Sequence, residues 1–200
     1  MASTCLENIA EFPDRIRKCL ANGNDGKPSL FFPGYRRSAV LMPLLLVNDE
    51  WHVLFTRRSN TVQDHKGQVS FPGGAADEMD IDSGNTACRE LEEEIGIHQK
   101  NVKILGQMAE MPTITQFLVA PVVGVVSWPI EIRPNPNEVD RVFTIPLCWL
   151  ADPSHHEERN YRLSDGSEHL VIFFEEYDGE LLWGVTARIV LNFLQKVGLP

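Results

Sequence analysis

The sequence predicts an α/β fold in which a mixed β-sheet lies between helices. Apolar runs of strand length alternate with stretches whose apolar residues recur every three or four positions, which indicates interleaved strands and helices. Several runs are joined by short turns and therefore form hairpins, which favours a mixed sheet over a doubly wound parallel one. The chain has 200 residues, 43% of them hydrophobic, so we expect a single globular unit with short decorations.

The N-terminal region predicts a helix followed by a linker. Residues 4–21 show an amphipathic helical pattern, with Pro13 as a kink or break. Its candidate buried positions are Leu6, Ile9, Ile16 and Leu20. Turn-forming residues dominate 23–33. We therefore expect residues 1–33 to form a helix and linker, and residues 34–200 to form the main domain.

The rest of the chain predicts strands first and a helix at the end. Strands are expected at Ala39–Val47, Trp51–Thr56, Val102–Glu110, Phe117–Val126 and Val139–Ile145. The first two flank an Asn48-Asp49 turn, which is typical of a hairpin. A second hairpin is expected for Tyr161–Leu163 and His169–Glu175, and Val185–Val197 has the periodicity of a closing helix.

Charge and hydropathy restrict the partners of this chain. A net charge of −10 speaks against non-specific nucleic-acid binding, which needs a basic face. The longest apolar runs, Ala39–Val47 and Phe117–Val126, fall short of the roughly 20 residues that cross a bilayer. Met1–Leu20 carries acidic residues and no apolar signal core. We expect no nucleic-acid or membrane partner and a cytoplasmic location.

The cysteines are scattered and form no C-x-x-C pair. They stand at positions 5, 19, 88 and 148, which argues against a zinc site and against a disulfide framework. Cys88 lies in an apolar helical pattern, so we expect it to pack in the core and not to act as a nucleophile.

The segment from Phe71 to Ile97 carries the most informative chemistry. Pro72-Gly73-Gly74 predicts a sharp turn whose backbone can approach a ligand, because glycine has no Cβ. A helix is predicted over Thr86–Ile95, with Asn85 as its N-cap and Gly96 as its left-handed stop.

Three carboxylates of this helix, Glu90, Glu93 and Glu94, share one narrow arc. Beside them runs an expected buried stripe of Ala87, Cys88, Leu91 and Ile95. Like charges three and four residues apart cost about 0.2–0.5 kcal/mol per pair, and a last helical turn disfavours acids. Solvated surface is the usual explanation of a Glu-rich face, but the adjoining glycines and apolar stripe favour a site. Divalent cations such as Mg²⁺ take such oxygen ligands and activate water against a phosphoryl group.

The same segment resembles the Nudix box. Arg89–Ile97 matches the second half of that motif, R-E-U-x-E-E-x-G-U with U aliphatic, at every specified position. The first half departs from it. Five residues separate Gly74 from Asp80, which stands where the family has Glu, and eight residues instead of seven separate Asp80 from Arg89. The resemblance implies a Nudix α/β/α sandwich and cleavage of a pyrophosphate bond in a nucleotide-containing substrate.

A narrower resemblance concerns the coenzyme A diphosphatase branch of the family. It is carried by Leu54–Ser59 and His65–Gly74, with further similarity at Pro121–Gly124, Glu138-Val139 and Trp183–Ala187. It covers about residues 36 to 195. It implies hydrolysis of coenzyme A or its thioesters to 3′,5′-ADP and 4′-phosphopantetheine with Mg²⁺ or Mn²⁺.

Residue roles follow from the resemblance by position. It implies that Glu90 and Glu94 are the principal metal ligands and that Glu93 is a further ligand or orients water. Arg89 is expected to pair with a carboxylate and orient it. Glu138 is a candidate base or additional ligand.

Candidate substrate contacts lie upstream of the acidic helix. Because side chains alternate along a strand, only one of Arg57 and Arg58 can face the site, and we prefer Arg57. The remaining candidates for substrate binding are His65, Lys66, Gly73 and Gly74, and the backbone carbonyl of Gly73 or Gly74 is also a candidate oxygen ligand for the metal.

Other functions remain open at this point. Another Nudix substrate, such as NADH, ADP-ribose or a nucleoside triphosphate, would use the same metal chemistry. A Nudix-fold binding module without turnover is a second alternative, although such modules tend to lose the Glu93-Glu94 pair. The oligomeric state is left as monomer or homodimer.

Overall fold

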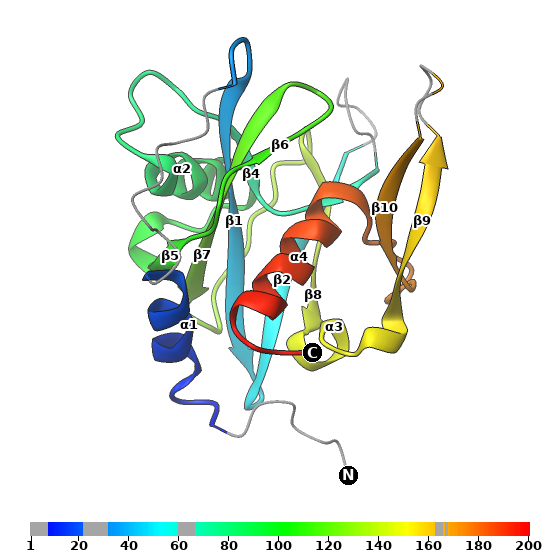
Figure 1. Ribbon diagram of the computed structural model, residues 1–200. Coiled ribbons are helices and arrows are strands. Elements are labelled where there is room, and N and C mark those ends of the chain that lie inside the picture. The colour runs from blue at the N-terminus through cyan, green and yellow to red at the C-terminus, as the bar shows by residue number, and fades with distance from the viewer. Residues whose placement is uncertain (1–7, 22–31, 60–66, 163–165, 167) are drawn as a thin grey trace.

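A computed structural model describes residues 8–21, 32–59, 67–162, 166 and 168–200 (Figure 1). The helices are α1 Phe12–Ala21, α2 Ser83–Ile95, α3 Leu147–Leu150 and α4 Gly184–Lys196. The strands are β1 Arg36–Val47, β2 Glu50–Arg58, β3 Val69–Ser70, β4 Gly73–Ala75, β5 Val102–Gln107, β6 Met111–Pro112, β7 Phe117–Val126, β8 Val139–Pro146, β9 His156–Arg162 and β10 Glu168–Phe174. Short 3₁₀ turns occur at Gln99–Asn101 and Pro153–His155.

The main sheet is mixed, as the sequence predicts. Its path runs β3-β2-β1-β7-β5, with β4 paired to β1, β6 to β7 and β8 to β2. β1 and β7 are parallel, whereas the other pairs of this sheet are antiparallel. Asn48 and Asp49 both have positive φ, which matches the twist of the β1–β2 hairpin. The predicted strand Phe117–Val126 is confirmed at both ends.

Helices cover both faces of the sheet, so the predicted α/β/α arrangement is confirmed. One core cluster joins the sheet to α1 and α4, and includes Phe12, Ile16 and Phe193. The other joins it to α2 through the predicted apolar stripe, including Leu91 and Ile95. Figure 1 shows α4 crossing one face of the sheet, with α2 on the other side of β1.

A second sheet stands beside α4. β9 and β10 form a two-stranded antiparallel hairpin, which Figure 1 shows to the right of the main sheet. Its core-facing residues Ile172 and Phe174 are buried in the same cluster as α4. The predicted hairpin is confirmed, although its strands extend beyond the expected Tyr161–Leu163 segment because β9 begins at His156.

Three local expectations are corrected by the structure. Helix α1 begins at Phe12, and Pro13 lies in its first turn, where the missing N–H costs no helical hydrogen bond. The N-cap of α2 is Asp82 and not Asn85, because the Asp82 side chain accepts from the Asn85 N–H at 2.8 Å. Gly73 and Gly74 lie in strand β4 and not in a sharp turn. The expected buried residue Leu6 lies outside the described residues.

The cysteine prediction is partly wrong. Cys88 is buried and free, as expected, and Cys19 is also free. Cys148 in α3 is disulfide-bonded, although the scattered cysteines argue against a disulfide framework. Disulfide formation depends on Cα atoms lying within about 7 Å in space, and spacing along a chain does not reveal that proximity.

Candidate active site

Helix α2 presents the three predicted carboxylates to different environments. Its apolar stripe packs on the sheet, which turns Glu94 inward until it is only 4% exposed. The Glu90 side chain is half-buried at the same helix edge, and Glu93 remains 55% exposed. Gly96 ends the helix with φ 74°, and its N–H donates to the Glu92 carbonyl, which confirms the predicted left-handed stop.

Glu94 is a buried acid that has only a long ion pair, with Arg58, among the described residues. Burial raises the pKa of its carboxyl to about 8, while Arg58 and a backbone hydrogen bond from Gly73 oppose that rise. The Arg58 Nη1 atom lies 4.0 Å from Glu94 Oε1, too far for a hydrogen bond. Glu90 and Glu138 add negative charge nearby, so they raise the pKa of Glu94 further.

The missing side chain of Gly74 leaves the space that the Glu90 carboxylate occupies. A Cβ at residue 74 would come within 2.5 Å of Glu90 Oε1, so only glycine leaves this space. Gly73 meets the β1 backbone instead, because its Cβ would lie 2.5 Å from the Ala39 carbonyl oxygen. The two glycines are therefore required for close packing and not for a special backbone conformation. Burial also raises the pKa of Glu90, although Arg89 acts against it.

Arg89 connects the acidic residues of the site. Its Nη1 donates to Glu90 at 2.8 Å and to Glu93 at 2.9 Å. Its Nε and Nη2 donate to the two oxygens of Asp80 at 3.3 and 3.1 Å, and Nη2 also donates to the Ala75 carbonyl. The hydrogen bond from Arg89 lowers the pKa of Asp80 to about 2. Asp80, which departs from the family motif, thus anchors Arg89.

The donor set is chemically suited to a hard divalent cation, but its side chains are engaged in ion pairs. Within the described ranges, no three His, Cys, Asp or Glu side chains are gathered as a ready metal cluster. Glu90 and Glu93 share Arg89 instead. The buried Glu94, with Glu90 and Glu138 as charged neighbours, nevertheless offers the carboxylate oxygens that Mg²⁺ prefers. We conclude that Glu90 and Glu94 could hold such a cation.

The two arginines at the end of β2 lie on opposite faces, as strand alternation predicts. Arg58 faces Glu94, whereas Arg57 pairs with Asp140 and Glu180 away from that carboxylate. The preference for Arg57 as the residue facing the site is therefore reversed in favour of Arg58. Strand alternation alone could not decide which arginine faces the site, because α2 could have packed against either face of the strand.

Glu138 lies close to this group, just before β8. Its charge affects the pKa of Glu90 and Glu94, and its Oε1 accepts from Asn135 Nδ2 at 3.0 Å. His65 and Lys66, predicted to contact phosphates, lie outside the described residues.

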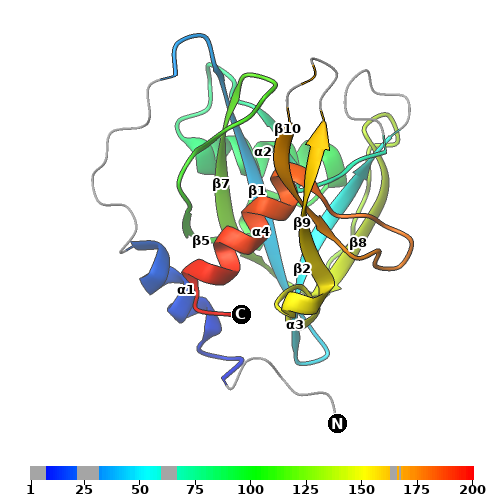
Figure 2. The ribbon, with the colours of Figure 1, turned by 45° about the vertical axis from the view of Figure 1, so that its right-hand side comes forward.

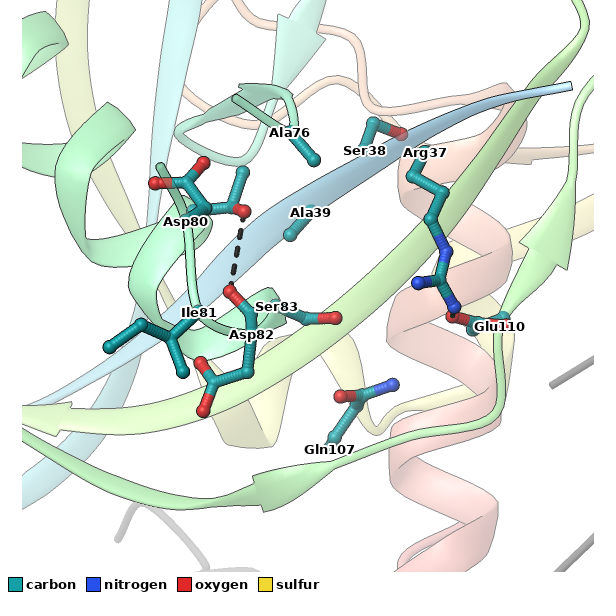
Figure 3. A pocket seen from close by; sticks show the side chains of 11 residues that line it. Arg37, Ser38, Ala39, Ala76, Asp80, Ile81, Asp82, Ser83, Gln107 and Glu110 are labelled. Atoms are coloured by element: carbon teal, nitrogen blue, oxygen red, sulfur yellow. Dashed lines mark hydrogen bonds and ion pairs between the residues drawn. The ribbon is translucent and has the colours of Figure 1, made fainter. Parts of the chain in front are cut away.

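A cavity of about 330 Å³ opens beside the first turn of α2 (Figure 3). Asp80 and Asp82 line it from the α2 side, and Arg37 and Glu110 form an ion pair at 3.7 Å in its wall. None of the glutamates on α2 lines it. A second hollow of about 220 Å³ lies between α1 and α4, also away from those glutamates.

Two residues that organise the site region, Asp82 and Glu180, are not among the residues predicted from the sequence. Asp82 could have been found, since Asp is as good an N-cap as Asn and stands three residues earlier. Glu180 bridges Arg57 and Arg141 and is 3% exposed. It gave no signal, because an acid beside Asp178-Gly179 looks like an ordinary surface turn.

No helix in the described ranges has the length and apolar character needed to cross a membrane.

Comparison with known families gives a consistent result. The NUDIX domain family matches residues 35–165 of the chain. Two bacterial proteins, each described as "Uncharacterized Nudix hydrolase NudL", are similar over most of their length. The one from Photorhabdus laumondii is 38% identical over 164 residues, covering 81% of this chain and 85% of that protein. The one from Yersinia enterocolitica is 35% identical over 173 residues, covering 86% and 87%.

Solved structures share the fold. A MutT/nudix family protein from Enterococcus faecalis has a TM-score of 0.54 and 15% identity, covering 96% of this chain and 75% of that one. The Nudix hydrolase RenU from M. smegmatis has a TM-score of 0.50 and 19% identity, covering 60% and 76%. At these identities the likeness concerns the fold alone.

Proposed function

The chain belongs to the Nudix hydrolase family, and from this premise we propose that it cleaves the pyrophosphate bond of coenzyme A or an acyl-CoA. The products would be 3′,5′-ADP and 4′-phosphopantetheine or its acyl derivative. Mg²⁺ or Mn²⁺ would be the cofactor, in keeping with the divalent-metal chemistry of Nudix hydrolases.

The observation that carries the hydrolase proposal is the packing of α2 against β4. Glu90 occupies the space left by Gly74, and buried Glu94 receives a hydrogen bond from the Gly73 backbone. The fold buries Glu94, whose carboxyl has a pKa of about 8, beside the carboxylates of Glu90 and Glu138. This charge distribution is unfavourable without a further partner. A bound divalent cation would offset that repulsion.

Each residue of the site then has a role that fits its contacts. A divalent cation, when bound, polarises a phosphoryl oxygen and lowers the pKa of a water molecule. Glu90 and Glu94 would hold it, and Glu93 would be a further ligand or orient water. Arg89 would orient Glu90 and Glu93 from its anchor on Asp80. Glu138 would accept the proton of the attacking water on Oε2, since Oε1 accepts from Asn135.

Arg58 is the proposed contact for substrate phosphate. Its Nε is buried and has no hydrogen-bond partner among the described residues, and its Nη1 stays 4.0 Å from Glu94. A phosphate oxygen would satisfy this guanidinium, which is suited to bidentate phosphate binding. His65 and Lys66 remain proposed phosphate contacts, and the Gly73 and Gly74 carbonyls proposed ligands.

Coenzyme A is favoured over other substrates by the resemblance of Leu54–Ser59 and His65–Gly74 to the coenzyme A diphosphatase signature. The NudL relatives carry no substrate in their descriptions. NADH, ADP-ribose and nucleoside triphosphates therefore remain alternatives, and a binding module without turnover is less favoured because Glu90, Glu93 and Glu94 are all present.

Incubation of the protein with coenzyme A and Mg²⁺ or Mn²⁺, followed by chromatography, tests the substrate. We expect 3′,5′-ADP to form with wild type and not with Glu94→Gln. Parallel reactions contain NADH, ADP-ribose and a nucleoside triphosphate. Rapid ADP-ribose cleavage without 3′,5′-ADP would reject coenzyme A as substrate and keep the hydrolase. Turnover of none of these compounds would support the binding module.

We also propose the broader organisation that the sequence predicts. Residues 1–33 would be an N-terminal addition to a hydrolase domain of residues 34–200. The protein would act in the cytoplasm on a small nucleotide substrate, as a monomer or homodimer.

A further inference from the structure

Two arginines face each other across neighbouring strands on the α4 side of the sheet. Arg57 of β2 and Arg141 of β8 are direct cross-strand partners in an antiparallel pair. Like charges in this position repel each other and destabilise the pairing. Something must offset the repulsion for β2 and β8 to stay paired at this point.

Glu180 provides the offset from the connection between β10 and α4, which runs beside β8 (Figure 2). Its Oε1 accepts from Arg57 Nη1 and from Arg141 Nη1, both at 2.9 Å. Its carboxylate is 3% exposed, whereas the outer partners of the arginines, Asp140 and Asp178, are 43% and 68% exposed. Removal of one partner from a buried ion pair is costly, whereas exposed pairs contribute little, so the loss of Glu180 should matter more here than the loss of Asp140 or Asp178.

The residues that follow this bridge reach the candidate active site. Arg58, next to Arg57, has its guanidinium 4.0 Å from Glu94. The Ser59 N–H donates to the Glu138 carbonyl at 2.8 Å, so the end of β2 also holds the residue before β8. The register shifts between Arg57 and Arg58, which makes this the point where pairing is irregular.

We infer that Glu180 is a positioning residue of the hydrolase: by bridging Arg57 and Arg141, it keeps Arg58 and Glu138 beside Glu94. This inference rests on the proposed function for the roles of those three residues. Without the carboxylate, only the exposed Asp140 and Asp178 would offset the two arginines. Their repulsion would push the strand ends apart one residue before the site begins, and Arg58 and Glu138 would move with them.

The test compares Glu180→Gln with Asp178→Asn, which removes the same charge from the exposed side of Arg141. Mn²⁺ affinity is measured without substrate by electron paramagnetic resonance, and kcat and KM are measured on whichever pyrophosphate substrate wild type cleaves. For Glu180→Gln we expect a fall of about tenfold in Mn²⁺ affinity and in kcat, the range for residues that orient metal ligands. Asp178→Asn should retain wild-type values of both, and Glu180→Asp should recover part of the loss.

A double variant, Arg141→Gln/Glu180→Gln, covers the case in which Glu180→Gln does not fold. It removes one charge of each sign, so the repulsion disappears together with the bridge. If the bridge positions the site by offsetting this repulsion, the folded double variant recovers wild-type kcat and Mn²⁺ affinity. Wild-type kcat and Mn²⁺ affinity in folded Glu180→Gln, or a roughly tenfold loss of both in the folded double variant, would overturn the inference. Because Mn²⁺ binding needs no substrate, such a result leaves the hydrolase proposal intact.

Discussion

Glu94 is the residue at which burial and charge conflict most directly. Loss of water around its carboxyl raises its pKa from the usual 4.5 to about 8. In the metal-free protein the folded state therefore holds a proton that the unfolded state releases between these values. The free energy of unfolding is highest, for this group, below about pH 4.5 and falls as the pH rises toward about 8.

Glu94→Gln should separate catalysis from stability. Hydrolysis should fall by at least about 100-fold, as for other groups that stabilise transition-state charge. The metal-free variant should be more stable than wild type at pH 8, since each pKa unit is worth about 1.4 kcal/mol. Denaturant unfolding at pH 5 and pH 8, with and without Mn²⁺, measures both effects. Equal pH dependence in wild type and variant would contradict the assigned burial of this charge.

The two glycines of β4 should respond differently to alanine. Gly73→Ala drives its Cβ into the β1 backbone, so it should lower the free energy of unfolding by about 1–3 kcal/mol. In Gly74→Ala the new Cβ meets only the far end of the Glu90 side chain, which can move aside. This variant should therefore lose less free energy of unfolding than Gly73→Ala and show a larger fall in kcat. Urea unfolding and kinetics on the two variants decide this. A wild-type kcat for Gly74→Ala would show that catalysis does not depend on the position of the Glu90 carboxylate.

Among the helices and strands, α2 is the one that connects the motif to the fold. Its N-cap Asp82, its apolar stripe and Gly96 together fix where the helix begins, how it is rotated and where it ends. Rotation is decisive for the site, because a turn of the helix about its axis would exchange the buried Glu94 for its exposed neighbours.

Replacing the N-cap tests the assigned start of α2. Asp82→Ala should lower the free energy of unfolding by about 1 kcal/mol, because the Asn85 N–H loses its acceptor. Asn85→Ala keeps that hydrogen bond and serves as the control, with little expected change. Thermal unfolding measures both, and a larger loss for Asn85→Ala would restore Asn85 as the cap.

Across the molecule, helix α1 is continuous with the main core. Phe12, Ile16 and Leu20 are buried in the cluster that also contains α4 residues. Sequence patterning predicts the inward face of this helix but not the surface that receives it, which is strand β5 with Leu20 against Gly106.

Ile16→Ala tests whether α1 unfolds together with the main domain. Ile16 is 0% exposed, so its truncation should cost about 2–5 kcal/mol and lower the midpoint of one cooperative transition. Lys18→Ala, at an exposed position of the same helix, is the control. Activity per folded molecule should not change. A separate early transition for α1 with an unshifted main transition would show that the helix is only a loose attachment.

The local elements of this protein follow from the chain alone. The β1–β2 hairpin, strand β7, the apolar stripe of α2 and the stop at Gly96 were all predictable. Each depends on side-chain periodicity or on the φ preference of one or two residues, which neighbours along the chain decide. The Nudix motif added the carboxylates of α2 and the expected fold.

How those residues are used depends on the folded arrangement. Glu93 and Glu94 share one arc of α2, yet one is exposed and the other has a pKa near 8 because of the sheet beneath it. Likewise, Arg58 and not Arg57 faces Glu94, and Glu180 bridges Arg57 to Arg141 over a long separation in the chain. Burial and charge interactions depend on groups that are distant in sequence and adjacent in space, so no local pattern contains them.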